Sequence, residues 1–253
     1  MQMRKGLVFI WQTALFLVVL GLGWELLIFT FNFPPYILPS PSLVVKALIA
    51  QGGVIMQNTA ITLLEIIVGL SLGIGLGCIV ALLMAVFLPL RLFFKPSLII
   101  SQALPTLAIA PLLVIWFGYG IASKIMTTIL MLFFPVASAF FDGLTRSNNQ
   151  WLELARTMRA SKWQYFYHIQ IPAAVPSLAS GIRVATAVAP IGAIVGEWVG
   201  SSQGLGFLLL NANARMQIDM MFACLLVIVI LALVLYFSVD ALLTRWLDKR
   251  EQM

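Results

Sequence analysis

Long stretches without a charged residue dominate the chain and predict its architecture. Runs such as 66–88 and 220–239 contain no charge. Each is long enough for a helix to cross a bilayer core of roughly 30 Å, which takes about 20 residues. The runs are continuously apolar, which is typical of helices and not of membrane-spanning strands. We therefore predict an all-α integral membrane protein with six transmembrane helices, at about 7–31, 60–88, 96–117, 122–141, 176–199 and 220–243.

The overall composition leads to the same class of protein. Of the 253 residues, 62% are hydrophobic and 9% are charged, and the mean hydropathy is +1.04. A soluble domain is about 45–50% apolar and about 25% charged, and its interior cannot hide this much apolar surface. The composition therefore excludes a soluble enzyme, a disordered chain and a secreted disulfide scaffold. Cys78 and Cys224 both lie in apolar runs, so we interpret them as small buried side chains.

The positive charges predict an orientation. Lys and Arg concentrate on cytoplasmic loops, so the net charge of +6 indicates topology here and not a nucleic-acid partner. With the N-terminus inside, twelve of the fifteen cations are cytoplasmic, and only Lys46, Lys124 and Arg215 lie outside. Both termini are then cytoplasmic, and the first apolar run is expected to be a retained span and not a cleaved signal peptide. The whole chain is one transmembrane domain.

The one long cytoplasmic segment, 142–174, predicts a helix-turn-helix. Asn148 or Asn149 is a suitable cap for a first helix, and Ser161 with Gln164 has the spacing of a capping box that starts a second helix. We expect Pro172 and Pro176 to end the second helix. Helical spacing places Trp151, Leu154, Ala155 and Met158 on one face, and Trp163, Phe166, Tyr167 and Gln170 on another. A structured, partly apolar loop of this kind favours a docking surface.

The same segment carries a motif. Glu153 and Ala155 are followed, at fixed spacing, by Ile169 and Pro172. This pattern resembles the Glu-Ala-Ala, three residues, Gly, nine residues, Ile-x-Leu-Pro motif of the inner-membrane permease subunits of ATP-binding-cassette (ABC) importers. Arg159 stands where the family has glycine. Because bulky residues with positive φ are uncommon, we predict a turn of ordinary handedness at Arg159.

The resemblance implies a type I ABC importer permease fold, a mechanism and partners. Such permeases pair, here as a homodimer, in the lipid of the cell inner membrane. A periplasmic or lipid-anchored solute-binding protein delivers the cargo. An ATPase subunit binds ATP and Mg and moves the cytoplasmic helices. The chain itself has no GxxxxGK[ST] phosphate loop, so we expect no cofactor in it. The residues expected to contact the ATPase are Glu153, Ala155, Arg159, Trp163, Tyr167 and Pro172.

Two further stretches resemble particular subgroups of these permeases and so limit the kinds of cargo to be expected. Residues 34–42, PPYILPSPS, resemble the start of permeases for sulfonates, taurine, nitrate and pyrimidine precursors. Residues 189–217, with GEWVGSS and NANARMQ, are most similar to the pyrimidine branch that serves thiamine synthesis. This implies a hydroxymethylpyrimidine-type thiamine precursor as cargo. Aliphatic sulfonate, taurine, nitrate and riboflavin-type compounds remain the alternatives.

Candidate residues for the transport path lie on the spans and their outer ends. Gly69, Gly73 and Gly77 in the second span, and a similar row from Gly181 to Gly196 in the fifth, let helices approach closely. The rows are consistent with a moving core and equally with simple packing. Glu65 lies on the first row, either as a structural side chain or as a cargo contact. The further candidates are Gln102, Glu197, Trp198, Asn211, Asn213 and Arg215, either as an outer mouth or as an anchor and docking rim for the binding protein.

Two rival classes are weaker. Residues 69–73 match the GxSxG pattern of a serine hydrolase, but they lie in mid-span, far along the chain from His168, which is the single histidine. A membrane enzyme is therefore disfavoured. A secondary transporter needs ionisable groups in mid-membrane, whereas Glu25, Glu65 and Glu197 are predicted near span ends.

Overall fold

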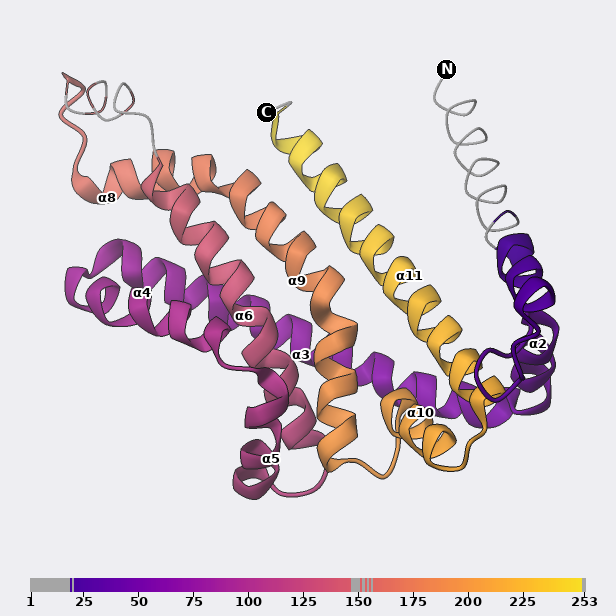
Figure 1. Ribbon diagram of the computed structural model, residues 1–253. Coiled ribbons are helices and arrows are strands. Elements are labelled where there is room, and N and C mark those ends of the chain that lie inside the picture. Colours follow the sequence, from indigo (N-terminus) through magenta and orange to yellow (C-terminus); the bar gives the residue numbers. More distant parts are fainter. Residues whose placement is uncertain are drawn as a thin grey trace, which may run out of the picture. The chain divides into compact units, whose positions relative to one another are not determined.

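The computed structural model describes residue 19, residues 21–146, residues 151, 153 and 155, and residues 157–251. No strand occurs among these residues, and the predicted all-α class is confirmed for them. The chain divides into two compact units, 1–57 with 208–227 and 58–207 with 228–253. The helices α3 (Gly52–Val86), α10 (Leu205–Ala214) and α11 (Ile218–Glu251) pass from one unit to the other (Figure 1).

The smaller unit contains a helix at Gly21–Phe31 and α2 (Pro41–Ala50). The start of the predicted first span, before residue 19, lies outside the described residues. Between the two helices, the carbonyl of Pro34 accepts hydrogen bonds from the N–H groups of Ile37 and Leu38. Pro41 occupies the first turn of α2, where a missing N–H costs nothing. A proline-rich turn followed by a short helix therefore connects Gly21–Phe31 to α3.

The larger unit is built around α6 (Ile121–Thr145), which lies between α3 and α9 (Ile171–Gly200). A Cβ atom added to Gly77 of α3 would lie 2.9 Å from the carbonyl oxygen of Phe133 in α6. A Cβ added to Gly181 of α9 would lie 2.8 Å from the Cβ of Ala139. Both predicted small-residue rows are therefore packing surfaces that bring the backbones of α3 and α9 against α6.

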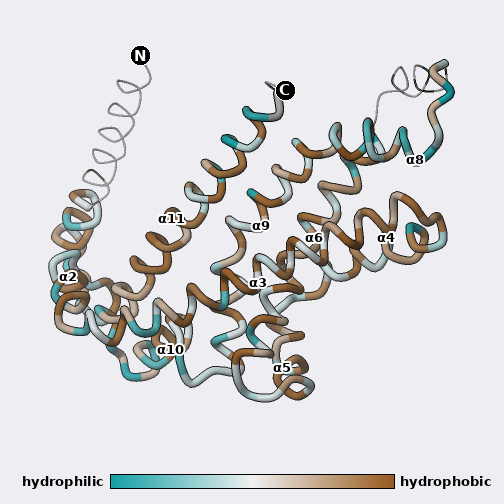
Figure 2. Tube along the Cα trace, turned by 180° about the vertical axis from the view of Figure 1, so that it is seen from behind, coloured by the Kyte–Doolittle hydropathy of each residue, from teal (hydrophilic) through white to brown (hydrophobic). Residues whose placement is uncertain are grey.

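Four helices are long and apolar enough to cross a membrane: α3, α6, the continuous run Lys162–Gly200, and α11. Figure 2 shows hydrophobic residues along most of α3 and α11. Hydroxyl side chains within the spans return their hydrogen bonds to the helix backbone. Thr127 and Thr128, for example, donate to the carbonyls of Ser123 and Lys124. This local bonding satisfies polar groups that have no water partner in a bilayer.

The predicted third span, 96–117, is not one straight helix. The structure has α4 (Leu88–Ala103) and α5 (Thr106–Phe117), which are bent by 108° at Leu104–Pro105. Leu104 has an extended ψ of 123°, because a residue before proline avoids the helical region. Counting the bent pair as one span gives five candidates among the described residues.

Arg91 fixes the connection between α3 and α4. Its Nε donates to the carbonyl of Met84 at 3.0 Å, and its Nη2 donates to the carbonyl of Ala85 at 3.3 Å. The guanidinium also lies 5.4 Å from the ring centroid of Phe141 in α6. A cation at the C-terminus of a helix is stabilised by the free carbonyls there, so Arg91 ties the end of α3 to α6.

Candidate functional site

The segment between α6 and α9, residues 146–172, is here called the coupling segment. Its second helix begins as predicted. The backbone N–H of Ser161 donates to Gln164 Oε1 at 2.7 Å, and the N–H of Gln164 donates to Ser161 Oγ at 3.2 Å. This reciprocal pair is a complete capping box at the start of α8 (Lys162–Tyr165).

The second helix does not end at Pro172 or Pro176, which corrects the prediction. Helix α8 continues through a π-helical turn, η1 (Phe166–Gln170), directly into α9. The N–H of Ile171 bonds to the carbonyl of Phe166, five residues back. Pro172 then stands in the first turn of α9, and the wider turn before it accommodates the proline, which has no N–H. The second helix of the coupling segment is therefore continuous with a membrane-spanning helix.

The aromatic residues of this helix divide between two surroundings. Trp163 and Tyr167 stack with ring centroids 5.9 Å apart, and both are more than half exposed. Phe166 is buried and packs in a cluster with Phe140 and Leu144 of α6. Its ring centroid nevertheless lies 6.1 Å from that of Trp163 and 5.6 Å from that of Tyr167, so the three aromatic residues predicted on one face do lie together, with Phe166 on the buried side. Gln170, also predicted on that face, donates to the carbonyl of Leu144 at 3.3 Å. The exposed stack of Trp163 and Tyr167 is a free apolar surface next to the capping box.

Arg159 adopts a left-handed backbone with a φ of 54°, which corrects the prediction of an ordinary turn. The N–H of Ala160 bonds to the carbonyl of Ala155 at 2.9 Å. A bond of this span, together with a left-handed residue before its donor, is a Schellman helix end. Arg159 thus takes the conformation that glycine takes most easily, which explains glycine at this place in the motif.

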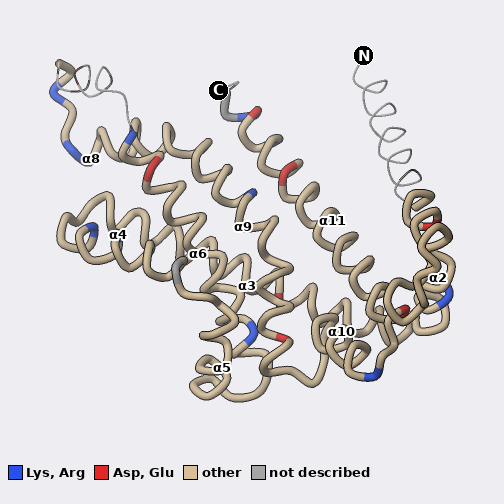
Figure 3. Tube along the Cα trace, viewed as in Figure 1, with Lys and Arg blue, Asp and Glu red and all other residues tan. Residues whose placement is uncertain are grey.

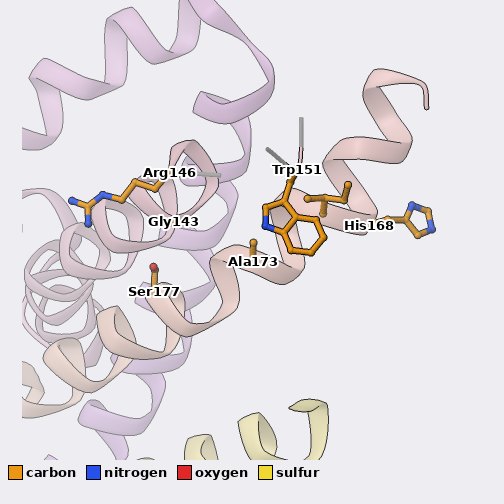
Figure 4. A pocket seen from close by; sticks show the side chains of 7 residues that line it. Gly143, Arg146, Trp151, His168, Ala173 and Ser177 are labelled. Carbon is orange, nitrogen blue, oxygen red and sulfur yellow. The ribbon is translucent and has the colours of Figure 1, made fainter. Parts of the chain in front are cut away.

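Only some of the other predicted contact residues of the coupling segment are among the described residues. Glu153 is exposed, and Ala155 is buried. Leu154 and the predicted caps Asn148 and Asn149 lie outside the described residues. Beside this segment is a cavity of about 440 Å³, in which the indole of Trp151 lies near Ala173 (Figure 4). Its lining also includes Gly143, Arg146, His168, Ile169 and Ser177.

A second site lies at the other end of the larger unit, where α3, α6 and α9 meet. Charged residues are sparse along these helices (Figure 3). Nevertheless, Glu65 of α3 and Lys124 of α6 form an ion pair, with side chains 0% and 6% exposed. Lys124 Nζ also donates to Ser201 Oγ at 3.1 Å. An unpaired charge here would cost several kcal/mol, of order 3–5, so each residue requires the other.

Glu197 of α9 forms the neighbouring half of this polar cluster. Its Oε1 accepts from the hydroxyl of Thr62 at 2.6 Å, and its Oε2 accepts from the N–H of Gly206 at 2.5 Å. Thr62 Oγ1 also accepts from the N–H of Leu205 at 2.8 Å. The carboxylate therefore lies at the N-terminus of α10, where the helix dipole favours negative charge. Glu197 is 1% exposed and ties α10 to α3 and α9; its part in an outer mouth stays a prediction.

The remaining predicted path residues lie on α4, on α9 and in the smaller unit. Gln102 is exposed on α4, near the bend, and Trp198 is partly exposed on α9. Asn211, Asn213 and Arg215 belong to the smaller unit. In that unit the N–H of Arg215 donates to the carbonyl of Asn211, and both Asn213 and Arg215 are exposed.

Two charged residues that matter here escaped the sequence reasoning. Lys124 was expected in an outer loop, but the row of small residues places it in the core, with its Cα 3.0 Å from a Cβ added to Gly196. Arg183 of α9 is the second: its Nε donates to Asp240 of α11 at 2.5 Å, and its Nη2 donates to Thr244 at 3.2 Å.

A cavity of about 680 Å³ opens beside the Glu65–Lys124 pair. Residues from α3, from the turn between α5 and α6, and from the turn after α9 line it. Its apolar wall includes Ile61, Leu64 and Ile121. The polar residues that line it are Glu65, Tyr119, Lys124, Ser201, Ser202 and Gln203.

Known proteins resemble this chain over most of its length. Residues 73–252 match the family described as the binding-protein-dependent transport system inner membrane component. A probable ABC transporter permease protein of Haemophilus influenzae is 50% identical over 229 residues, which cover 90% of this chain and 94% of that protein. The formylaminopyrimidine transport permease protein ThiX of Halalkalibacterium halodurans is 39% identical over 197 residues, which cover 78% of each chain.

The fold is also found among solved structures. An inward-facing structure of the MetNI methionine ABC transporter superposes with a TM-score of 0.67. The match covers 78% of this chain and 97% of that chain, at 19% sequence identity. At this identity the likeness shows the fold alone.

Proposed function

This chain belongs to the family of binding-protein-dependent transport system inner membrane components, and from that premise we propose that it carries a small amino-heterocycle into the cell. It is an ABC importer permease subunit and not an enzyme, and ATP hydrolysis resides in a separate subunit. The cargo that we propose is a hydroxymethylpyrimidine-type precursor of thiamine.

The exposed stack of Trp163 and Tyr167 is the main support for the proposed contact with the ATPase. It stands on a helix that runs without interruption into a membrane-spanning helix, so a push on the coupling segment is transmitted directly along α9. Large aromatic side chains are the residue type that dominates protein interfaces. We assign this stack, with Glu153, Ala155, the left-handed turn at Arg159 and the helix junction at Pro172, to contact with the ATPase.

The cargo assignment is supported by the relative that transports formylaminopyrimidine, at 39% identity. The cavity beside α3 and α6 agrees with it, because its two charged residues, Glu65 and Lys124, cancel one another. A sulfonate or nitrate would favour a cationic site, since charge-assisted hydrogen bonds bind anions strongly. A neutral or weakly basic heterocycle suits the balanced cavity better.

The assembled transporter proposed here contains two copies of this chain, two ATPase subunits and a solute-binding protein outside the inner membrane. Each copy crosses the membrane six times with both termini in the cytoplasm. The first span comes from 7–31, and the bent pair α4 and α5 forms the third. The coupling segment then faces the ATPase, and the Glu65–Lys124 cavity faces the binding protein.

Growth of a thiamine-precursor auxotroph tests the cargo. A strain that carries the complete transporter is expected to grow on limiting hydroxymethylpyrimidine, and deletion of this permease is expected to abolish that growth. Thiamine itself is the control that restores growth in both strains. Equal growth with and without the permease, combined with loss of sulfonate or riboflavin use in the deletion strain, would overturn the cargo and leave the permease assignment intact.

A further inference from the structure

We propose that the cavity beside the Glu65–Lys124 pair is a cargo-binding site within the permease itself, one that takes the amino edge of a flat heterocycle. The inference rests on the proposed function for the class of cargo. It adds a second recognition step after delivery by the binding protein. The volume of about 680 Å³ lies in the usual range of small-molecule sites, about 300–1,000 Å³.

The carboxylate of Glu65 is the first element of the site. The side chain is fully buried, and it lines the cavity. One oxygen is ion-paired with Lys124, whereas Oε2 accepts no hydrogen bond from an N–H or hydroxyl group of the described residues; the neighbouring acidic side chain is Glu197. A buried carboxylate oxygen without a donor is costly, and proteins usually satisfy such atoms. An N–H group of a ligand in the cavity would supply the missing donor.

The ammonium group of Lys124 is the second element. It has three N–H bonds. Within the described residues, one is directed at Glu65 and one at Ser201 Oγ, which leaves one for a ligand. The site therefore presents an acceptor, Glu65 Oε2, next to a donor, Lys124 Nζ. An aminopyrimidine has the complementary edge, since its exocyclic amino group donates and the adjacent ring nitrogen accepts.

Tyr119 is the third element and provides an aromatic surface. Its side chain is 86% exposed and lines the same cavity. Gly118 and Gly120, on either side, have φ values of 78° and 146°, which few other residues adopt. The two glycines hold the turn between α5 and α6 in a shape that leaves the phenol ring free. A planar heterocycle can stack on this ring while its edge reaches Glu65 and Lys124.

The balance of charge sets the specificity. Lys124 is paired with Glu65, and a second acidic side chain, Glu197, neighbours Glu65, so the site has no net positive charge and an anionic sulfonate gains no net attraction. A neutral ring with a donor beside an acceptor satisfies both partners without separating them. The pair thus offers one hydrogen-bond acceptor and one donor to the polar edge of the ring. The apolar wall with Ile61 and Leu64 accommodates the rest of the ring.

Direct binding to the complete transporter tests this site. The permease with its ATPase, in lipid nanodiscs and without the binding protein, is titrated with radiolabelled hydroxymethylpyrimidine. The variant Tyr119→Ala is expected to weaken binding by about five- to tenfold, the effect of losing one aromatic contact. The neutral double variant Glu65→Gln with Lys124→Gln is expected to bind at least about tenfold more weakly. Tyr36→Ala, an exposed tyrosine outside the cavity, is the matched control and is expected to bind as the wild type does.

Uptake and ATPase activity separate the possible failures. If the wild type imports no hydroxymethylpyrimidine, the proposed cargo is wrong. If it imports the compound but shows no binding without the binding protein, or if Tyr119→Ala binds normally, the cavity site is wrong. The double variant could fail to assemble, which gel filtration and the basal ATPase rate reveal. Tyr119→Ala then decides alone, because its exposed side chain is not needed for folding.

Discussion

Thr62 in α3 donates its hydroxyl hydrogen to Glu197 in α9 over 2.6 Å, although 135 positions separate the two residues in the chain. The same Thr62 oxygen accepts the N–H of Leu205, and Glu197 accepts the N–H of Gly206. The side chain of Asn58 accepts the N–H of the intervening Gly204 at 2.7 Å. Three successive N–H groups at the start of α10 are therefore satisfied by α3 and α9, and this network joins the three helices.

Removing the Glu197 carboxylate should destabilise the protein. In Glu197→Ala, the hydroxyl of Thr62 and the N–H of Gly206 both lose their buried acceptor. Each loss costs about 1–3 kcal/mol, so we expect a decrease in unfolding free energy of about 2–6 kcal/mol. Thermal unfolding of the purified protein in detergent measures it. Glu153→Ala, at an exposed glutamate, is the control. Equal thermal midpoints for Glu197→Ala and Glu153→Ala would contradict a stabilising role of the Glu197 carboxylate.

Gly204 should tolerate no side chain. Its φ is +110°, and a Cβ placed there would overlap the Glu197 carboxylate. Gly118 also has a positive φ, of +78°, but a Cβ at that position would meet open space. We expect Gly118→Ala to cost about 1–2 kcal/mol from backbone strain alone, and Gly204→Ala to cost clearly more. The thermal midpoints of the two variants are measured side by side. Gly118→Ala reports backbone strain alone, and Gly204→Ala reports backbone strain together with the overlap on Glu197. Similar values would show that the overlap is relieved at no cost.

The left-handed turn at Arg159 predicts an unusual gain from a glycine. Arg159→Gly removes strain of about 1 kcal/mol, so the end of the first coupling helix should become more stable. Arg159→Ala removes the guanidinium but keeps the Cβ and is expected to give no gain. Hydrogen exchange at the amide of Ala160, which bonds to Ala155, reports the closure of the turn. Faster exchange in Arg159→Gly than in the wild type would contradict the Schellman geometry.

Substitutions of the aromatic residues in the coupling segment should affect either the stability of the permease or its contact with the ATPase, depending on the residue. Phe166 is buried among α6 residues, and Phe166→Ala is expected to cost about 3–5 kcal/mol of stability. Trp163 is exposed, so Trp163→Ala should leave the thermal midpoint unchanged while it weakens co-purification with the ATPase and lowers uptake. Normal co-purification and uptake in Trp163→Ala would remove this surface from the ATPase contact.

The sequence predicted those features that are local or periodic. The capping box at Ser161 and Gln164 depends on residues three apart, and the structure confirms it. The small-residue rows around Gly77 and Gly181 have helical spacing, and the structure confirms them as packing surfaces. The permease family was identifiable from the residues around Glu153, and the match over 73–252 confirms it.

The sequence missed those features that depend on contacts between distant residues. Glu65 and Lys124 lie in different helices, and a lysine close to a span end is normally assigned to a loop, so nothing local indicated a buried pair. The turn at Arg159 was predicted to have ordinary handedness because few large residues adopt a left-handed backbone. In the structure, the hydrogen bond that ends the helix at Ala155 requires the left-handed conformation. The apolar run at 96–117 predicted one span, whereas the 108° bend between α4 and α5 depends on packing.

Accessibility of single cysteines tests the proposed orientation. In a background without Cys78 and Cys224, cysteines at Gln51 and Gln203 should react with a membrane-impermeant maleimide in sealed cells, because both positions are exposed and outside in the proposed topology. A cysteine at Gln150, which lies outside the described residues, should react only after the cells are opened. Gln203 is the most informative position, since it lines the cavity beside Lys124. Labelling of position 150 but not of 203 in sealed cells would invert the topology. It would also place that cavity on the same side as the ATP supply, where no binding protein could deliver cargo to it.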